Sequence, residues 1–210
     1  HSIHGPSFGP FQGWATNALF RGAERFAGRM TDHFVTVADA MRDQYLAAGI
    51  SQADDYTRIP SGFDLQPFLD AENSPTKRAS LGLSPGDFVV GKIARLFELK
   101  GHDDLFAIAP RLAKRIPNIR FLLVGDGVLR GRFERLAKEI GCGQNFIFTG
   151  LVPPSEIPSL VGVMDSLVHL SRREGLPRAL PQAMAAAKPV VAFDCDGAGA
   201  VCLDGKTGHL

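Results

Sequence analysis

The strongest constraint on the fold is a regular alternation of apolar and helical segments between Phe88 and Phe193. The near-continuous apolar runs have the length of strands buried on both faces, over Phe88 to Ile93, Arg120 to Val124, Asn145 to Phe148, Ser166 to Leu170 and Pro189 to Phe193. Helical spacing separates them, over His102 to Arg115, Val128 to Ile140, Ser155 to Val161 and Pro177 to Ala187. This alternation predicts an α/β fold with a doubly wound parallel sheet, whose ligands bind at the carboxyl ends of the strands.

The segment before this region has the same character but fewer strands. Phe34 to Val37 and Tyr56 to Ile59 are typical of strands, and Trp14 to Met30 and Ala38 to Ala48 of helices. Because a parallel sheet needs several strands with helices on both faces, we expect these strands to end a second Rossmann-like sheet.

The ends of the chain and its polar stretch predict the domain organisation. The chain opens on His1, and it stops after the turn-like run Asp204 to Gly208, where another strand is expected. We therefore interpret it as a fragment with two parts, 1–68 and 69–210. A polar linker is expected at Ala71 to Pro75.

Composition excludes several classes of protein. Lys and Arg number 23 against 22 Asp and Glu, a net charge of +1, which argues against a nucleic-acid arm. Apolar residues make up 45% of the chain, enough for a buried core. The three cysteines have no disulfide or zinc spacing, and no secretory signal or membrane span is recognisable, so we expect a reducing cytoplasmic location.

Two cations follow the first apolar segment of the alternation. Arg95 and Lys100 bracket the start of the next predicted helix, where unpaired N–H groups favour an anion. Together they suit a diphosphate. The alternative is that both are solvated and pair with the nearby Glu98, Asp103 or Asp104.

Two further loops contain backbone features rather than charges. Gly125 and Asp126 belong to a Gly-Asp-Gly run after a strand, which permits close approach of a ligand but is equally typical of a tight turn. Val152 lies in a loop with Pro153 and Pro154 that could present backbone groups to a flat ligand such as a base.

The most specific loop contains Glu174, Gly175 and Leu176. Glu174 ends a predicted buried strand, and Pro177 suits the first turn of a helix, so Gly175 and Leu176 would offer N–H donors at a positive helix end. A carboxylate beside an anion site needs another task, and accepting hydroxyl protons from a sugar is one. The alternative is that Glu174 is an ordinary acidic residue at a helix N-terminus.

At these residues the sequence resembles a known family. The run REGLPRALPQAMAAAKPVVAFD, from Arg173 to Asp194, is similar to the signature region of the family 4 retaining glycosyltransferases, which have the GT-B fold of two facing Rossmann-like domains. Further similar motifs follow in order along the chain: HSIHG at 1–5, TVADAMRD at 36–43, IPSGFD at 59–64, GKIARLFELKGHDDL at 91–105, LLVGDG at 122–127, FTGLV at 148–152 and DGKTG at 204–208.

The resemblance implies a reaction and a set of roles. A sugar would move from a nucleotide diphosphate sugar, such as a UDP-sugar, to an acceptor hydroxyl with retention of configuration, with no separate cofactor. The implied donor-site residues are Arg95 and Lys100 on the diphosphate, Glu174 near the transferred sugar, Gly175 and Leu176 as backbone contacts, Val152 at the base, and Gly125 with Asp126 in the loop after the second strand. His4 matches a histidine close to the reacting centre.

One position departs from the family pattern. The second acidic residue, which typically holds the ribose hydroxyls, is Gln182 here. An amide accepts one hydrogen bond and donates another, and the lost charge assistance amounts to about 1 to 2 kcal/mol. We expect altered affinity rather than inactivity. We assign Asp194 to Asp196 to a turn and expect no metal site.

The expected partners are the donor and a carbohydrate or lipid-linked acceptor, with peripheral contact of the full-length protein with the inner membrane face. The resemblance also implies that the start of the first domain and the final helix are missing, so we expect the fragment to be inactive. Two other functions stay open: a nucleotide-sugar epimerase of the same fold, and a non-catalytic nucleotide-sugar binding module.

Overall fold

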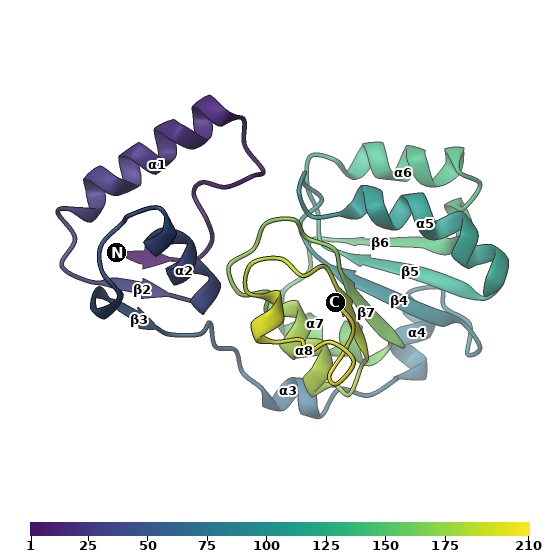
Figure 1. Ribbon diagram of the computed structural model, residues 1–210. Coiled ribbons are helices and arrows are strands. Elements are labelled where there is room, and N and C mark those ends of the chain that lie inside the picture. The colour runs from purple at the N-terminus through teal and green to yellow at the C-terminus, as the bar shows by residue number, and fades with distance from the viewer.

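The computed structural model describes residues 1–210, which form two α/β units joined by the segment between Arg58 and Gln66 (Figure 1). The first unit consists of β1 (Ser2–Ile3), α1 (Trp14–Gly28), β2 (Phe34–Thr36), α2 (Asp39–Ala47) and β3 (Tyr56–Arg58). The second consists of α3 (Gln66–Leu69), α4 (Pro75–Ser80), β4 (Phe88–Ile93), α5 (His102–Arg115), β5 (Ile119–Val124), α6 (Arg130–Glu139), β6 (Phe146–Gly150), α7 (Ile157–Gly162), β7 (Ser166–His169), α8 (Ala179–Ala185) and β8 (Val190–Ala192).

The first unit is a parallel sheet with the strand order β1-β2-β3. Its core contains Phe34 and Ile3 from the strands and Met41 and Tyr45 from α2. The strand β1 is an addition to the sequence prediction, because a strand of only Ser2 and Ile3 is too short to have a readable periodicity. Ser2 pairs with Val35 of β2.

The second unit confirms the predicted doubly wound parallel sheet. Its strands run in the order β6-β5-β4-β7-β8, and all of them pair in parallel. Side chains alternate between the two faces, so that Val89 of β4 packs with α7 and α8 while Val90 packs with α5 and α6. Figure 1 shows the two helical layers on opposite faces of the sheet.

Several element boundaries differ from the sequence prediction. The helix expected from Val128 begins at Arg130, and the helix expected from Ser155 begins at Ile157, after a 3-10 turn at Pro154–Glu156. The helix expected from Pro177 begins at Ala179, with Arg178 as its N-cap. Phe68 is buried in the core of the second unit. No helix combines the length and the apolar character needed to cross a bilayer.

Candidate functional site

The strand order of the second sheet reverses between β4 and β7. The chain runs from β4 through β5 to β6 on one side and then returns to β7 and β8 on the other. At such a reversal the loops leave the sheet in opposite directions and open a crevice at the carboxyl ends of the strands. Arg95 and Lys100 follow β4, and Glu174 follows β7, so the sheet topology brings these predicted residues to one crevice.

Lys100 and Glu174 form an ion pair in this crevice. The Nζ atom of Lys100 lies 2.5 Å from Oε1 of Glu174, and Nε2 of His169 lies 3.6 Å from the same oxygen. Both members of the ion pair are largely shielded from solvent. Two of the acidic loop residues that could have neutralised Lys100 have other partners, because Asp103 pairs with Arg132 and Asp104 with Arg172. Lys100 takes its counter-charge from Glu174, in the loop after β7 on the other side of the crevice.

Two buried basic groups lie behind this pair. Lys92 on β4 is 1% exposed, and its Nζ has no hydrogen-bond partner. Burial lowers the pKa of Lys92 to about 7, although the nearby Glu174 acts in the opposite direction. Burial also lowers the pKa of His169 to about 4, so this imidazole is neutral at neutral pH. Sequence reasoning missed both groups, because nothing in an apolar strand pattern marks one polar residue as functional.

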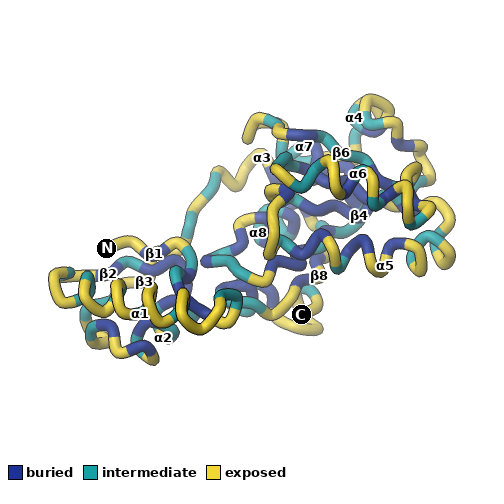
Figure 2. The backbone as a smooth tube through the Cα atoms, turned by 90° about the horizontal axis from the view of Figure 1, so that it is seen from above, coloured by how far each residue is buried: buried dark blue, intermediate teal, exposed yellow.

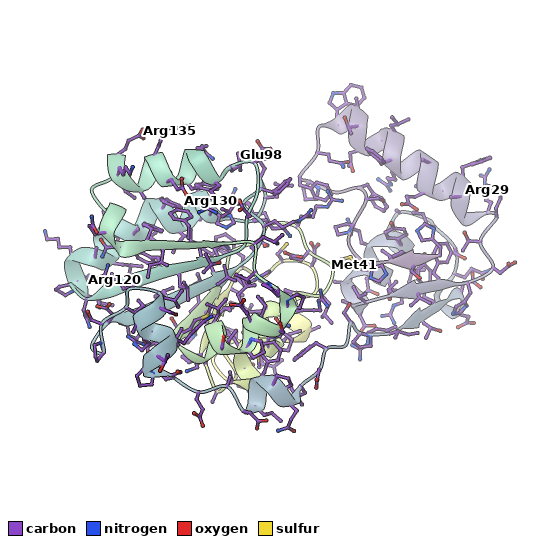
Figure 3. All side chains as sticks on the ribbon, turned by 180° about the vertical axis from the view of Figure 1, so that it is seen from behind. Arg29, Met41, Glu98, Arg120, Arg130 and Arg135 are labelled. Carbon is purple, nitrogen blue, oxygen red and sulfur yellow. The ribbon has the colours of Figure 1, made fainter.

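Two cavities meet at Glu174. The smaller, of about 320 Å³, is lined by His4 and Gly5 of the first unit and by Arg95, Phe97, Glu98, Leu99, Lys100, Arg173, Glu174 and Gly175. The larger, of about 700 Å³, contains Val152, Gln182 and Glu174 together with apolar side chains such as Phe63 and Phe68. Glu98, labelled in Figure 3, belongs to the edge of the second unit that faces the first. Most of the predicted site residues thus gather around Glu174.

The two arginines of the smaller cavity are stacked on aromatic rings. The guanidinium of Arg95 lies 5.0 Å from the ring centroid of Phe97, and that of Arg173 lies 4.5 Å from that of Phe11. Such contacts orient a guanidinium while leaving its N–H groups for other partners. Arg173 was not among the predicted site residues, although its position directly before Glu174 in the motif was an available signal.

Gly175 lies at the contact between the two units. A Cβ atom at this position would come within 2.0 Å of the backbone oxygen of His4, so no other residue fits without displacing the first unit. The predicted helix-terminal position of Gly175 and Leu176 is wrong, since α8 begins at Ala179. Their N–H groups make no hydrogen bond within the protein. The side chain of Leu176 packs against the core of the first unit.

Gly125 and Asp126 lie outside both cavities. Gly125 has a φ of 134°, and a Cβ there would lie 2.3 Å from the backbone oxygen of Ala94. The Asp126 carboxylate accepts a hydrogen bond from Gly127 N–H and another from Arg130, and these bonds lower its pKa. The two residues support the loop that carries Arg95, and the structure brings neither into the crevice.

No group of three or more His, Cys, Asp or Glu side chains is arranged to hold a metal ion. The predicted turn at Asp194 to Asp196 is part of the loop after β8, where Asp196 has a φ of 51°. Its carboxylate oxygen Oδ2 accepts a hydrogen bond from the backbone N–H of Glu174 at 2.7 Å.

Comparison with known proteins decides the family. Residues 73–210 match the family described as glycosyl transferases group 1, which is well over half of the chain. The chain belongs to this family. Among its relatives is an enzyme of Mycolicibacterium smegmatis named GDP-mannose-dependent alpha-(1-6)-phosphatidylinositol monomannoside mannosyltransferase. The two sequences are 31% identical, and the alignment covers 94% of this chain and 53% of the relative.

Solved structures agree with the fold of the group 1 glycosyl transferase chain. HepE of Anabaena, in complex with UDP-glucose, superimposes with a TM-score of 0.83 at 28% identity, over 100% of this chain and 57% of HepE. A glycosyltransferase of Rickettsia africae has the same fold, with a TM-score of 0.81 at 21% identity over 99% of this chain and 54% of its own. These matches confirm the GT-B type of α/β fold. The chain spans about half the length of the relatives it matches.

Proposed function

We propose that this chain supplies the donor site of an enzyme that transfers a sugar from a nucleoside diphosphate sugar to an acceptor hydroxyl with retention of configuration. The observation that carries the proposal is the Lys100–Glu174 pair at the crevice between β4 and β7, with Arg95 and Arg173 lining the same cavity. The main chemical demand of such a transfer is stabilisation of the departing diphosphate. Positive charges held in place before the reaction meet that demand.

Different parts of the donor bind in the two cavities. In the smaller cavity Arg95 and Lys100 contact the diphosphate, and Glu174 accepts hydrogen bonds from the transferred sugar. In the larger cavity Val152 contacts the base and Gln182 the ribose. His4 reaches the reacting centre from the first unit, so the first unit forms part of the acceptor side and the second unit the donor side. HepE binds UDP-glucose, and the mycobacterial relative is named GDP-mannose-dependent. A UDP-sugar and a GDP-sugar are therefore the two donors to compare in a binding experiment.

Isothermal titration calorimetry with UDP, GDP, UDP-glucose and GDP-mannose tests the donor site directly. We expect one nucleotide series to bind and the chain to transfer no sugar to a crude acceptor extract. Transfer requires donor and acceptor to be held together across the cleft, and the first unit has a sheet of only three strands. Binding of none of the four compounds would overturn the proposal. Release of a free epimerised sugar would support the epimerase alternative, and steady transfer would show that the acceptor side is complete.

Gln182 provides a second test of the donor arrangement. If its amide lies on the ribose, Gln182→Glu is expected to improve binding of the ribonucleotide relative to its 2′-deoxy form, because a carboxylate accepts hydroxyl protons more strongly than an amide. The affinity ratio of the two nucleotides should rise about fivefold or more. An unchanged ratio would place Gln182 away from the ribose.

The helix α1 supports the membrane contact that we also propose for the enzyme. Its polar residues Asn17 and Glu24 face the protein, where they bond to Gly9 N–H and to the hydroxyl of Tyr45. Its apolar residues Leu19 and Phe26 are seven positions apart and so share one helix face, and they are 70% and 64% exposed. Figure 2 shows a helix with no buried segment. The apolar face of α1 thus points away from the molecule.

An arginine lies at the C-terminal end of α1. Arg29 is its C-cap, and Figure 3 shows Arg29 at the end of α1 that is farthest from the second unit. Arg25, in the last turn, faces the protein instead, where its Nε donates a hydrogen bond to the backbone oxygen of Ala48. An exposed apolar helix face with a basic residue beside it is typical of helices that lie in the headgroup region of anionic bilayers. A lipid-linked acceptor would be reached from such a position.

Sedimentation with phosphatidylglycerol-containing vesicles checks this contact. We expect Leu19→Gln combined with Phe26→Gln to weaken vesicle binding about tenfold or more, because two apolar side chains no longer enter the bilayer. Ile108→Gln combined with Val128→Gln, at exposed apolar positions of the second unit, is the matched control and should bind normally. Equal binding of both variants, or dimers abolished only by the α1 substitutions, would contradict the membrane contact.

A further inference from the structure

The loop after β8 holds the segment that contains Glu174. The backbone N–H of Glu174 donates a hydrogen bond of 2.7 Å to Oδ2 of Asp196, and the N–H of Gly197 donates one of 3.0 Å to the backbone oxygen of Gly175. These bonds join two loops that lie more than twenty residues apart in the sequence. Asp196 lines neither cavity, so it touches the segment and leaves the ligand space free.

The backbone of this loop is constrained where it meets the segment. Asp196 has a φ of 51°, in the left-handed region that favours Gly, Asn and Asp. A Cβ at Gly197 would lie 2.2 Å from the backbone oxygen of Gly175, so the loop approaches as closely as a backbone can. Non-glycine residues held in this region cost free energy, and the surrounding contacts must compensate. The hydrogen bond to Glu174 is such a contact.

The held segment connects several parts of the proposed donor site. The side chain of Glu174 meets Lys100 and lies near His169, while Gly175 rests against the backbone oxygen of His4. Rotation of the Glu174 peptide would therefore move the carboxylate and the contact between the units together. One acceptor oxygen on Asp196 restrains that rotation.

We propose that Asp196 is a positioning residue, which fixes the Glu174 peptide so that the Glu174 carboxylate meets the transferred sugar. The inference rests on the proposed donor site. Asp196 acts through Glu174, so it should affect the sugar part of the donor and not the nucleotide. A residue with a merely structural role would weaken nucleotide and nucleotide sugar alike.

Substitutions at Asp196 separate the hydrogen bond from the backbone conformation. Asp196→Gly removes the acceptor but suits the positive φ, whereas Asp196→Asn keeps an acceptor oxygen and also tolerates that conformation. With the donor that the wild type binds, UDP-glucose or GDP-mannose, we expect Asp196→Gly to weaken nucleotide-sugar binding about tenfold and to leave the nucleoside diphosphate within about twofold. Asp196→Asn should recover most of the loss. Asp204→Gly, at another carboxylate that accepts a backbone N–H, is the matched control.

A double-mutant comparison and hydrogen exchange complete the test. In the Glu174→Gln background, adding Asp196→Gly should change nucleotide-sugar binding little, because both changes act on one contact. If the wild type binds no nucleotide, the proposed function fails but exchange of the Glu174 amide still tests Asp196. That amide should exchange about tenfold faster or more in Asp196→Gly, because its acceptor is removed. Unchanged exchange, or an unchanged ratio of nucleotide-sugar to nucleotide affinity, would overturn the inference.

Discussion

Replacing Lys92 with methionine is expected to raise the free energy of unfolding at pH 7 by about 3 to 5 kcal/mol. The Lys92 ammonium is 1% exposed and has no hydrogen-bond partner, and burial lowers its pKa from 10.5 to about 7. A pKa difference of one unit between the folded and unfolded chain corresponds to about 1.4 kcal/mol. Methionine has a similar length and no charge, so the desolvation cost disappears while the packing is largely kept.

The buried Lys92 also makes the stability of the wild type depend on pH. The unfolded chain holds the Lys92 proton more tightly than the folded chain, so the wild type gains stability as the pH rises above about 7, and below that the full cost is present. Between pH 7 and pH 9 the gain from Lys92 is about 2 to 3 kcal/mol. Urea unfolding at several pH values measures how the free energy of unfolding rises with pH. The rise between pH 7 and pH 9 that comes from Lys92 should be absent in Lys92→Met and present in Lys114→Met, which replaces an exposed lysine of α5. Equal slopes in wild type and Lys92→Met would contradict a titrating buried ammonium.

Replacing Arg95 or Lys100 with alanine is expected to weaken nucleoside diphosphate binding by about 1.5 to 3 kcal/mol, roughly ten- to hundredfold. Both cations line the smaller cavity at the carboxyl end of β4. Arg95 can form two parallel bonds to phosphate oxygens, whereas Lys100 acts as a point charge. Calorimetry measures the loss, and Arg111→Ala, which removes an exposed arginine of α5 that lines neither site cavity, is the control. Unchanged binding of the nucleoside diphosphate in both site variants would show that the diphosphate does not bind in this cavity.

Glu174→Gln supplies a test of opposite sign in the same assay. In the structure Lys100 is neutralised by Glu174 at 2.5 Å, so a diphosphate must compete with that carboxylate for the ammonium. Removal of the negative charge is expected to strengthen binding of the nucleoside diphosphate, because the local charge becomes more positive. Binding of the nucleotide sugar should gain less, since the sugar loses its hydrogen-bond acceptor. Weaker diphosphate binding in Glu174→Gln would argue that Glu174 orients Lys100 toward the phosphates.

The sequence pattern predicted elements reliably where burial requires apolar residues at particular positions. Strands of a parallel sheet are covered on both faces, so most of their residues are apolar, and Phe88–Ile93 was predicted with its observed ends although it contains Lys92. The helix His102–Arg115 was equally clear, since its buried residues recur at helical spacing. By contrast, the start of α8 was predicted too early, because Pro177 is compatible with a first helical turn and with the extended segment that precedes one.

The sequence by itself determined the sheet, the order of its strands along the chain, and the residues at the strand ends. Those followed from local apolar patterns and from the rule that ligands bind at carboxyl ends. Only the tertiary structure decided which groups meet. Lys100 and Glu174 come from loops separated by three intervening strands of the chain, and the burial of Lys92 and the Asp196 bond to Glu174 depend on how the loops pack. Charges and N–H groups act over a few ångströms, and distances of that size between remote residues are set by packing, which no local pattern records.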